Sequence, residues 1–258
     1  MYFLSENVIH ITIFIYGLRV GSFSNVCIYR LPLSKSLKSP PSNCPHCSSP
    51  IRFYDNIPLV SYILLKGKCR QCQKRISFRY PFVEMLGGVF ALFIYLKYGF
   101  TLEALVYYTF IICLVIITFI DIDHQIIPDI ISLPGIPIGF LASFALPSIT
   151  FSDSLIGILA GGGSLFIVLW AYHLITGIEG MGGGDVKLLA MIGAIVGWEG
   201  VILTIFISSI TGTIVGLFIM LRTKKGLKLA VPFGPFLSTG AILYVFYGSE
   251  LIQWYFNI

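Results

Sequence analysis

Long apolar stretches separated by short polar segments dominate the chain. They predict about eight transmembrane helices, located roughly at 8–28, 82–96, 103–120, 130–147, 154–176, 187–198, 201–221 and 232–256. Several of these stretches approach or exceed the roughly 20 residues that cross a bilayer core. At about 1.5 Å per residue the stretch 187–198 is too short to cross alone, so it is either a half-helix or a helix that continues past Gly200. The pattern predicts an all-α polytopic membrane protein.

Composition excludes the main alternatives to this fold class. The chain is 56% hydrophobic and 11% charged, whereas soluble domains are about 25% charged. A water-soluble fold of 258 residues could not bury so much apolar side chain. A membrane β-barrel would instead show short segments of alternating polarity. The first apolar segment has no basic residues before it and no small-residue cleavage site after it, so we expect a retained helix.

The only sizeable polar region divides the chain into three predicted parts. Residues 1–29 form the first transmembrane helix, residues 30–80 form a small cytoplasmic loop domain, and residues 81–258 form the remaining transmembrane domain. Ten of the 17 lysines and arginines lie between Arg30 and Arg79, together with a single acid, Asp55.

This charge distribution predicts the orientation in the membrane. Basic loops between apolar spans are typical of the cytoplasmic side, and their placement argues against a nucleic-acid partner. Alternation of the spans then puts the segments 121–129 and 177–186 on the cytoplasmic side. It puts 222–231 there as well, and this loop contains four further basic residues that were not used to set the orientation.

Carboxylates at the membrane edge are the first candidate for chemistry. Asp121 directly follows an apolar run, and Asp185 follows three glycines and precedes an apolar helix. An ionisable group at membrane depth is a functional hypothesis by default. Two such carboxylates in one water-filled pocket could share a proton, activate water and protonate a leaving amine. The alternative is that these acids cap helices or are solvated, with Asp129 as an N-cap and Asp123 exposed to water.

Paired cysteines in the polar loop are the second candidate. Cys44-x2-Cys47 and Cys69-x2-Cys72 are separated by 21 residues. Four thiolates with this spacing suit a structural Zn²⁺ site with tetrahedral geometry. Disulfides are the alternative, but a cytoplasmic loop lies in a reducing environment. The metal would stabilise a loop that has little hydrophobic core of its own.

Further motifs occur in a fixed order along the chain. They are Gly21–Pro32, the two Cys-x-x-Cys pairs, Arg79–Glu84, Phe119–Asp129, Gly182–Asp185 and Pro232–Phe236. Together they resemble the motifs of the bacterial type IV prepilin peptidases. These enzymes are bifunctional leader peptidase/N-methyltransferases of the GxGD aspartyl class.

The resemblance implies a peptidase activity with assigned acids. The first catalytic aspartate falls on Asp121, eight residues before Asp129, in preference to Asp123. The second falls on Asp185. The implied substrates are prepilins or pseudopilins, whose short basic leader is cleaved at the cytoplasmic face of the bacterial inner membrane.

The same resemblance implies N-methylation of the new N-terminus, with S-adenosylmethionine as methyl donor. It suggests a donor site in the N-terminal half of the chain, around Gly21, Asn25, Arg30 and Glu84. The alternative for Glu84 is an interfacial residue paired with Arg79 or with a lipid headgroup.

Other functions compete with this interpretation. An intramembrane zinc metalloprotease requires a histidine pair such as HExxH, and the four histidines are scattered. A serine protease would need a GxSxG motif, which the sequence does not contain. A transporter would suit glycine-rich spans with buried acids, but both acids are predicted at one membrane face. A non-enzymatic scaffold and a monofunctional peptidase without methyl transfer also remain as alternatives.

Overall fold

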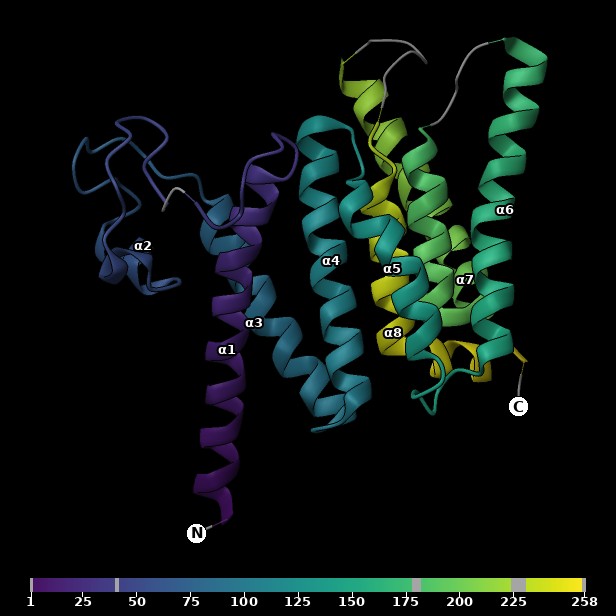
Figure 1. Cartoon of the computed structure of the whole chain (residues 1–258), viewed down its shortest axis with the longest axis horizontal. Helices are drawn as coiled ribbons and strands as arrows, with labels where there is room; N and C mark the ends of the chain where they lie inside the picture. The colour runs from purple at the N-terminus through teal and green to yellow at the C-terminus, as the bar shows by residue number, and fades with distance from the viewer. Residues whose placement is uncertain (1, 40–41, 178–181, 224–230, 257–258) are drawn as a thin grey trace. The chain divides into compact units, whose positions relative to one another are not determined.

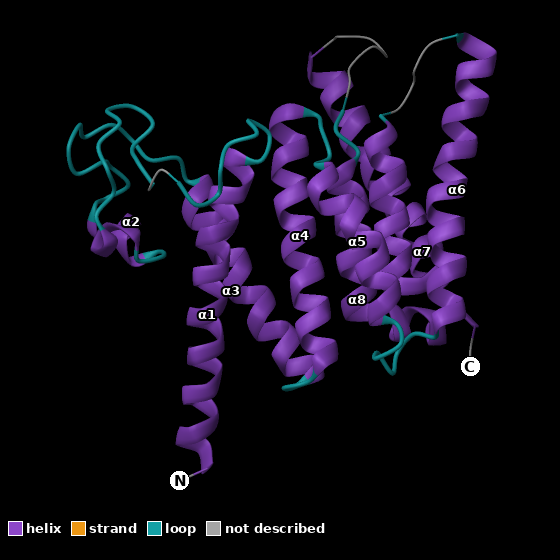
Figure 2. Ribbon diagram, in the orientation of Figure 1, coloured by secondary structure: helices purple, strands orange, loops and turns teal. Residues whose placement is uncertain are grey.

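The computed structural model describes residues 2–39, 42–177, 182–223 and 231–256. Within them it is built from helices joined by loops (Figures 1 and 2). The long helices are α1 (Tyr2–Arg30), α3 (Arg79–Tyr98), α4 (Leu102–His124), α5 (Asp129–Ala142), α6 (Phe151–Thr176), α7 (Gly183–Thr223) and α8 (Gly234–Phe256). The polar loop adds the short helices η1 (Phe53–Asn56) and α2 (Val60–Leu64). The all-α prediction is confirmed.

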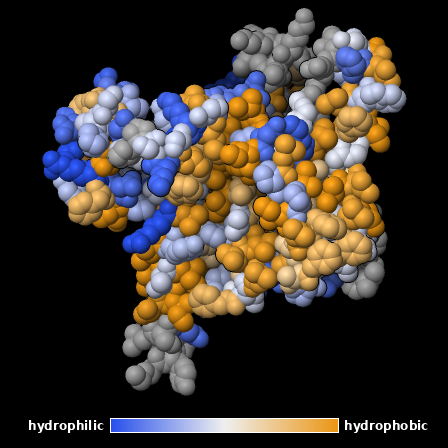
Figure 3. Space-filling model, viewed as in Figure 1, coloured by the Kyte–Doolittle hydropathy of each residue, from blue (hydrophilic) through white to orange (hydrophobic). Residues whose placement is uncertain are grey.

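Five of the described helices are long and apolar enough to cross a membrane. They are α1 from Glu6, α3, α4, α6 and α7 to Arg222, and α5 is a shorter apolar helix. Large apolar side chains cover the outside of α6, where Leu159, Ile167 and Leu174 are each more than 60% exposed. Such a surface suits lipid rather than water, and the hydrophobic side chains are plain over these helices in Figure 3. The protein is a multi-pass membrane protein.

Helix α7 resolves the uncertainty about the stretch 187–198. The helix runs from Gly183 to Thr223, with one break at Gly197, where φ is 72° and ψ is −177°. Positive φ is readily accessible to glycine, so the chain interrupts the helix there without a loop. The two predicted spans are therefore two segments of one interrupted helix.

The chain divides into two compact units at the boundary between Ile116 and Ile117, within α4. Unit 1 holds α1, α3 and the polar loop. Its two long helices pack closely, since a Cβ added to Gly17 would lie 2.5 Å from the carbonyl oxygen of Gly87. Small residues that let backbones approach are a common device of membrane helix pairs.

Unit 2 contains α5, α6, α7 and α8, with α7 in contact with each of the other three. In Figure 1 these helices lie side by side. The seam between α6 and α7 is the tightest: a Cβ on Gly193 would lie 2.1 Å from the Gly157 carbonyl oxygen. Ser154 Oγ also donates a hydrogen bond to the Ala194 carbonyl oxygen at 2.7 Å. The core of unit 2 thus fixes the first segment of α7, which begins beside Asp185.

Candidate active sites

Asp121 lies in the last turn of α4, with 5% of its surface exposed. Its Oδ2 accepts a hydrogen bond at 2.9 Å from the backbone N–H of Gly234, the first residue of α8. Asp185 lies in the first turn of α7 and is half-buried. The two carboxyl groups are close enough to interact electrostatically. The structure therefore brings together two acids that are separated by 64 positions in the sequence.

Glycine and an ion pair set the position of Asp185. Gly184 lies close to Ile127. A Cβ added at position 184 would lie 3.0 Å from the Cβ of Ile127. Lys187, two residues after Asp185, forms an ion pair with Asp129 at 2.8 and 3.0 Å. This pair joins the start of α5 to the first turn of α7.

Two expectations about the neighbouring acids meet the structure differently. The predicted N-cap role of Asp129 is wrong, because Pro128 occupies the N-cap position and makes no side-chain cap. Asp129 is the first helical residue, and its carboxylate binds Lys187 instead. Asp123 is exposed, as expected for a solvated acid, whereas Asp121 is buried. Burial beside a second acid is the environment in which two carboxyl groups share a proton.

The four loop cysteines of unit 1 form one cluster. Their Sγ atoms lie within 4.8 Å of one another, with Cys44 and Cys72 at 3.9 Å and Cys47 and Cys69 at 4.0 Å. All four are free thiols, so disulfides do not join them. Zinc–sulfur bonds of about 2.3 Å in a tetrahedron would separate the sulfur atoms by about 3.8 Å. The cluster therefore fits a tetrahedral metal ion.

Two similar turns present these thiols. The N–H of Cys44 bonds to the Ser49 carbonyl oxygen, and the N–H of Cys69 bonds to the Lys74 carbonyl oxygen. In each turn the residue after the second cysteine has positive φ: 55° at Ser48 and 56° at Gln73. The two Cys-x-x-Cys segments thus use the same local fold to aim their sulfur atoms at one point.

Local hydrogen bonds favour the thiolate form that binds metal. The side chain and backbone of Ser49 lower the pKa of the Cys47 thiol to about 6. The backbone N–H groups of Cys72 and Gln71 lower the pKa of the Cys69 thiol. In each pair of cysteines, therefore, hydrogen bonds lower the pKa of one thiol, Cys47 in the first pair and Cys69 in the second.

A pocket of about 430 Å³ lies in unit 1, between the polar loop, the end of α1 and the start of α3. The charge pattern predicts that these two helix ends lie on the cytoplasmic side. Three of the four residues predicted around the methyl donor line it: Asn25, Arg30 and Glu84. Gly21 is not among the lining residues. Its lack of a side chain lets α1 approach α3, since a Cβ there would lie 2.7 Å from the Cα of Glu84. The volume lies within the range of small-molecule sites.

Glu84 binds the backbone of the polar loop. Its Oε2 accepts the backbone N–H of Leu59 at 2.9 Å, and the Ser22 side chain donates a second hydrogen bond. Leu59 has φ 59° and ψ −48°, and the N–H of Val60 bonds to the Pro58 carbonyl oxygen at 2.6 Å. A three-residue turn with positive φ is rare and strained, so the Glu84 carboxylate secures a backbone conformation that is costly by itself.

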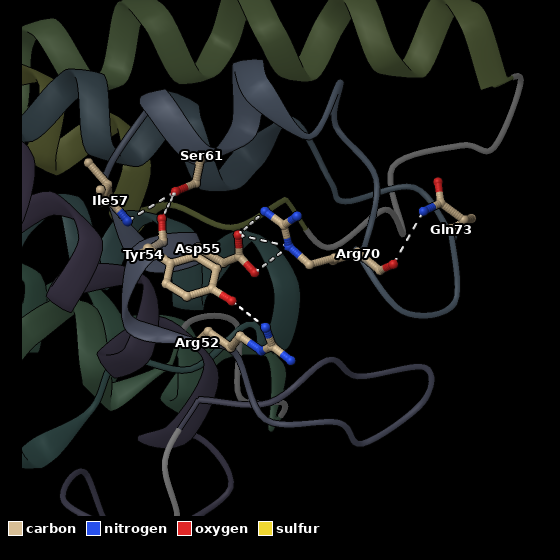
Figure 4. Close-up of polar contacts among 7 residues, drawn as sticks. All are labelled: Arg52, Tyr54, Asp55, Ile57, Ser61, Arg70 and Gln73. Atoms are coloured by element: carbon tan, nitrogen blue, oxygen red, sulfur yellow. Dashed lines mark hydrogen bonds and ion pairs between the residues drawn. The ribbon is translucent and has the colours of Figure 1, made fainter.

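Polar contacts join η1 to the second cysteine turn (Figure 4). Arg70, between Cys69 and Cys72, donates to both carboxylate oxygens of Asp55, at 2.7 to 3.2 Å. The Arg70 guanidinium holds the pKa of Asp55 below its usual value. Arg52 donates to the Tyr54 hydroxyl. The guanidinium groups of Arg52 and Arg70 lie 5.8 and 5.6 Å from the centre of the Tyr54 ring. The second cysteine turn and η1, which both line the pocket described above, are therefore joined by side-chain contacts.

Reasoning from sequence missed three of these partners. Lys187 and Leu59 were not singled out, and nothing in their local sequence predicts the acids that they bind. Gly234 belongs to a motif that was noted, Pro232–Phe236, but its contact with Asp121 spans 113 residues. The glycine and prolines beside an apolar helix were the available signal for a turn at this position.

Comparisons with known proteins match both units. Residues 15–98 match the model of the bacterial peptidase A24 N-terminal domain, and residues 108–217 match that of the type IV leader peptidase family. The first range contains the cysteine cluster and Glu84, and the second contains Asp121 and Asp185.

Similar proteins from several bacteria share most of their length with this chain. A prepilin leader peptidase/N-methyltransferase of Pseudomonas putida is 36% identical, over 91% of this chain and 89% of the relative. Proteins of the same name from Pseudomonas aeruginosa and Neisseria gonorrhoeae are 37% and 39% identical, over 93% and 86% of this chain and 90% and 85% of the relatives. No solved structure matches the chain. The chain belongs to the type IV leader peptidase family.

Proposed function

We propose that this protein is a bifunctional membrane enzyme that processes type IV prepilins or pseudopilins. It removes the basic leader peptide at the cytoplasmic face of the bacterial inner membrane and then methylates the new N-terminus. Asp121 and Asp185 are the catalytic acids of the peptidase. The observation that supports this proposal is that Asp121, which is buried, and Asp185, which is half-buried, have carboxyl groups close enough to interact electrostatically in unit 2.

The proposed cleavage is general acid–base hydrolysis by a pair of carboxyl groups that share one proton. The ionised carboxylate takes a proton from a water molecule while the water oxygen attacks the scissile carbonyl carbon. The protonated partner donates to the carbonyl oxygen, and proton transfer to the leaving amine accompanies breakage of the C–N bond. Water is the only other reactant, so the products are the leader acid and the new amine.

The charge pattern supports a cytoplasmic location for this chemistry. The polar loop carries ten basic residues and one acid, which is typical of the cytoplasmic side. Asp121 and Asp185 lie at the ends of spans that alternation predicts on the same side. A substrate with a basic leader in the cytoplasm and an apolar helix in the bilayer would have its scissile bond at this level.

The pocket of unit 1 supports the methyl-transfer half of the proposal. Asn25, Arg30 and Glu84 line it, together with the aromatic residues Tyr29 and Tyr80. S-adenosylmethionine would supply the methyl group when bound there. The protein would exclude water with the polar loop and hold the pocket wall through the Glu84 contact with Leu59.

The cysteine cluster supports a structural zinc site. Cys44, Cys47, Cys69 and Cys72 would occupy all four positions of a tetrahedral ion, leaving none for water. Such an ion would fix the turn that contains Arg70, and Arg70 would in turn hold Asp55 in η1. Zinc would therefore stabilise the shape of the pocket and would take no part in the hydrolysis.

The test is cleavage of a purified model prepilin by wild type, Asp121→Asn and Asp185→Asn. We expect each variant to lose activity by about 10²- to 10⁴-fold, the usual contribution of general acid–base groups. Each variant should still methylate a pilin that has already been cleaved. Wild-type cleavage by either variant, at equal protein level, would remove that residue from the proposed mechanism.

A monofunctional peptidase is the second candidate. The pocket and the cysteine cluster favour the bifunctional enzyme, because the proposed hydrolysis by the aspartate pair uses neither of them. Mass spectrometry of the processed pilin separates the two candidates. An N-terminus that is cut but never gains the mass of a methyl group would restrict the proposal to cleavage.

A further inference from the structure

The Asp121 carboxylate receives a backbone hydrogen bond of a particular kind. Gly234 N–H is 2.9 Å from Asp121 Oδ2, and the contact is buried. Because Gly234 is the first residue of α8, this N–H is one of the donors that a helix leaves free at its N-terminus, where the helix dipole also favours negative charge. A Cβ at this position would lie 2.7 Å from the same oxygen. A side chain at this position would therefore have to displace the Asp121 carboxylate.

Asp185 has a different environment. It lies in the first turn of α7, and its own N–H donates to the Gly182 carbonyl oxygen at 3.2 Å. Among the described residues we find no hydrogen-bond donor to its carboxyl group. The nearest cation on its helix, Lys187, is bound to Asp129. The helix dipole of α7 acts on Asp185, but the direct donor acts on Asp121.

Among the described residues, the charged groups next to the two acids on α4, α5 and α7 do not reverse the difference. Asp123 and His124 lie on the last turn of α4 and are exposed. Helix α5 contributes Asp129, whose charge is balanced by Lys187 from α7. The first turn of α8 contains no acid. A hydrogen bond to a charged group is among the stronger ones, and it favours the ionised form of its acceptor.

We propose that Gly234 is a positioning residue that assigns the two roles in the aspartate pair. Its N–H and its missing Cβ keep Asp121 ionised, so Asp121 takes the proton from water. Asp185 holds the proton that the pair shares and delivers it to the substrate. This assignment rests on the proposed function, because it presupposes that both acids act in cleavage.

The wild-type protein offers a direct measurement. Phe233–Gly234 is the only Phe-Gly dipeptide in the sequence. Labelling phenylalanine with ¹³C at the carbonyl and glycine with ¹⁵N therefore gives a single amide signal for Gly234 in a carbonyl-correlated NMR spectrum. The full chain in nanodiscs would be titrated with acid and base, and the cleavage rate would be measured over the same pH range.

The expected signal is a downfield amide proton wherever the enzyme is active, since an amide bonded to a carboxylate resonates downfield. It should move upfield along the acidic limb of the activity profile, as Asp121 gains its proton. Asp121→Asn should abolish this movement, whereas Asp185→Asn should preserve it. An amide signal that changes only along the alkaline limb would show that Asp121 holds the shared proton, and the assignment would be overturned.

Gly234→Ala supplies a second test, with Gly216→Ala in α7 as its control. The added methyl at 234 displaces Asp121, whereas a methyl at 216 meets nothing within 4 Å. Weakening the hydrogen bond should move the acidic limb of the cleavage profile to higher pH by about one unit. An unchanged profile in a folded Gly234→Ala variant would contradict the proposal. Should that variant fail to fold, the wild-type titration still decides.

The catalytic pair and the assignment of roles within it can fail separately. If Asp121→Asn or Asp185→Asn cleaves at the wild-type rate, that residue is not catalytic and the proposed aspartate pair is wrong. If both variants are inactive but Gly234 titrates with the alkaline limb, only the assignment of roles is wrong.

Discussion

Asp121 in unit 2 and Glu84 in unit 1 each accept one backbone N–H at 2.9 Å. The donor to Asp121 belongs to the N-terminus of a long helix, so the backbone positions the acid. The donor to Glu84 belongs to Leu59, in a strained turn of a loop, so the acid positions the backbone. The same contact thus has opposite roles, and the difference lies in which partner is fixed by packing.

This comparison predicts different sensitivities for the two sites. Unit 2 should respond to any added atom at its helix seams, because its backbones cannot move apart without displacing α7. Unit 1 should respond to loss of the side-chain contacts that shape the loop, or to loss of the proposed metal ion. Four experiments test this contrast.

The largest effect should come from Gly193→Ala in α7. The new Cβ would lie 2.1 Å from the backbone oxygen of Gly157, which has no flexible side chain to yield. We expect the free energy of unfolding to fall by about 3 kcal/mol, together with cleavage. Gly163→Ala in α6 is the control, since its Cβ meets nothing within 4 Å. Thermal unfolding in detergent measures the stability of both variants. Equal stability would show that the contact between α6 and α7 can accommodate an added methyl group.

Loss of the metal should affect the two activities unequally. Replacing one ligand in each turn, Cys44→Ser with Cys69→Ser, should reduce methyl transfer by about 10- to 100-fold through weaker metal binding. Cleavage should change much less, because the ligands lie in unit 1. Cys113→Ser, outside the cluster, is the control. Metal content and both rates would be measured on the same preparations, and an equal loss of both activities would argue against this separation.

Substitutions of Glu84 separate a positioning role from a charge role. Glu84→Gln keeps an oxygen that can accept the Leu59 N–H, whereas Glu84→Ala leaves that donor without its acceptor. We expect Glu84→Ala to raise the KM for the methyl donor by about tenfold, and Glu84→Gln to stay near wild type. If Glu84→Gln is as defective as Glu84→Ala, the negative charge itself binds the donor.

The smallest effect should come from the ion pair between Asp55 and Arg70, in which the Arg70 side chain is half-exposed. Arg70 lowers the pKa of Asp55, so this pair stabilises the folded loop above the unfolded pKa of aspartate, near 3.9. That contribution is lost as pH falls through the lowered value. Asp55→Asn should shift the unfolding temperature at pH 7 by only about 1 °C. The shift should vanish in acid, and a constant shift at all pH values would point to another cause.

Local sequence patterns were sufficient to predict the helices and the cysteine cluster, but not most of the contacts between distant residues. Apolar length predicted the helices, and the break near 198–200 lies at Gly197. Thiol spacing predicted the cysteine cluster, because four ligands on two turns need only local order and one metal. Pattern also indicated the pairing of Asp121 with Asp185, although their roles stay proposals.

Long-range contacts could not be predicted in the same way. Nothing near Glu84 indicates that its partner is a leucine backbone 25 residues earlier, because a backbone N–H leaves no trace in side-chain pattern. Asp129 looked like a helix cap, yet Lys187 from another helix binds it. The seam at Gly157 and Gly193 depends on which faces of two helices meet, and that is a property of the whole unit.

One lipid-facing helix of unit 2 is shorter than the core of a bilayer. Helix α5 has 14 residues, so it is about 21 Å long, and its side chains Ile138 and Leu141 are each 64% exposed. A bilayer core is about 30 Å thick, and a mismatch of this size thins the membrane locally or admits headgroups and water. Hydrolysis needs water at the level of the scissile bond. The thickness of the host bilayer, set by the length of its acyl chains, therefore becomes a variable that can tune the rate of leader removal.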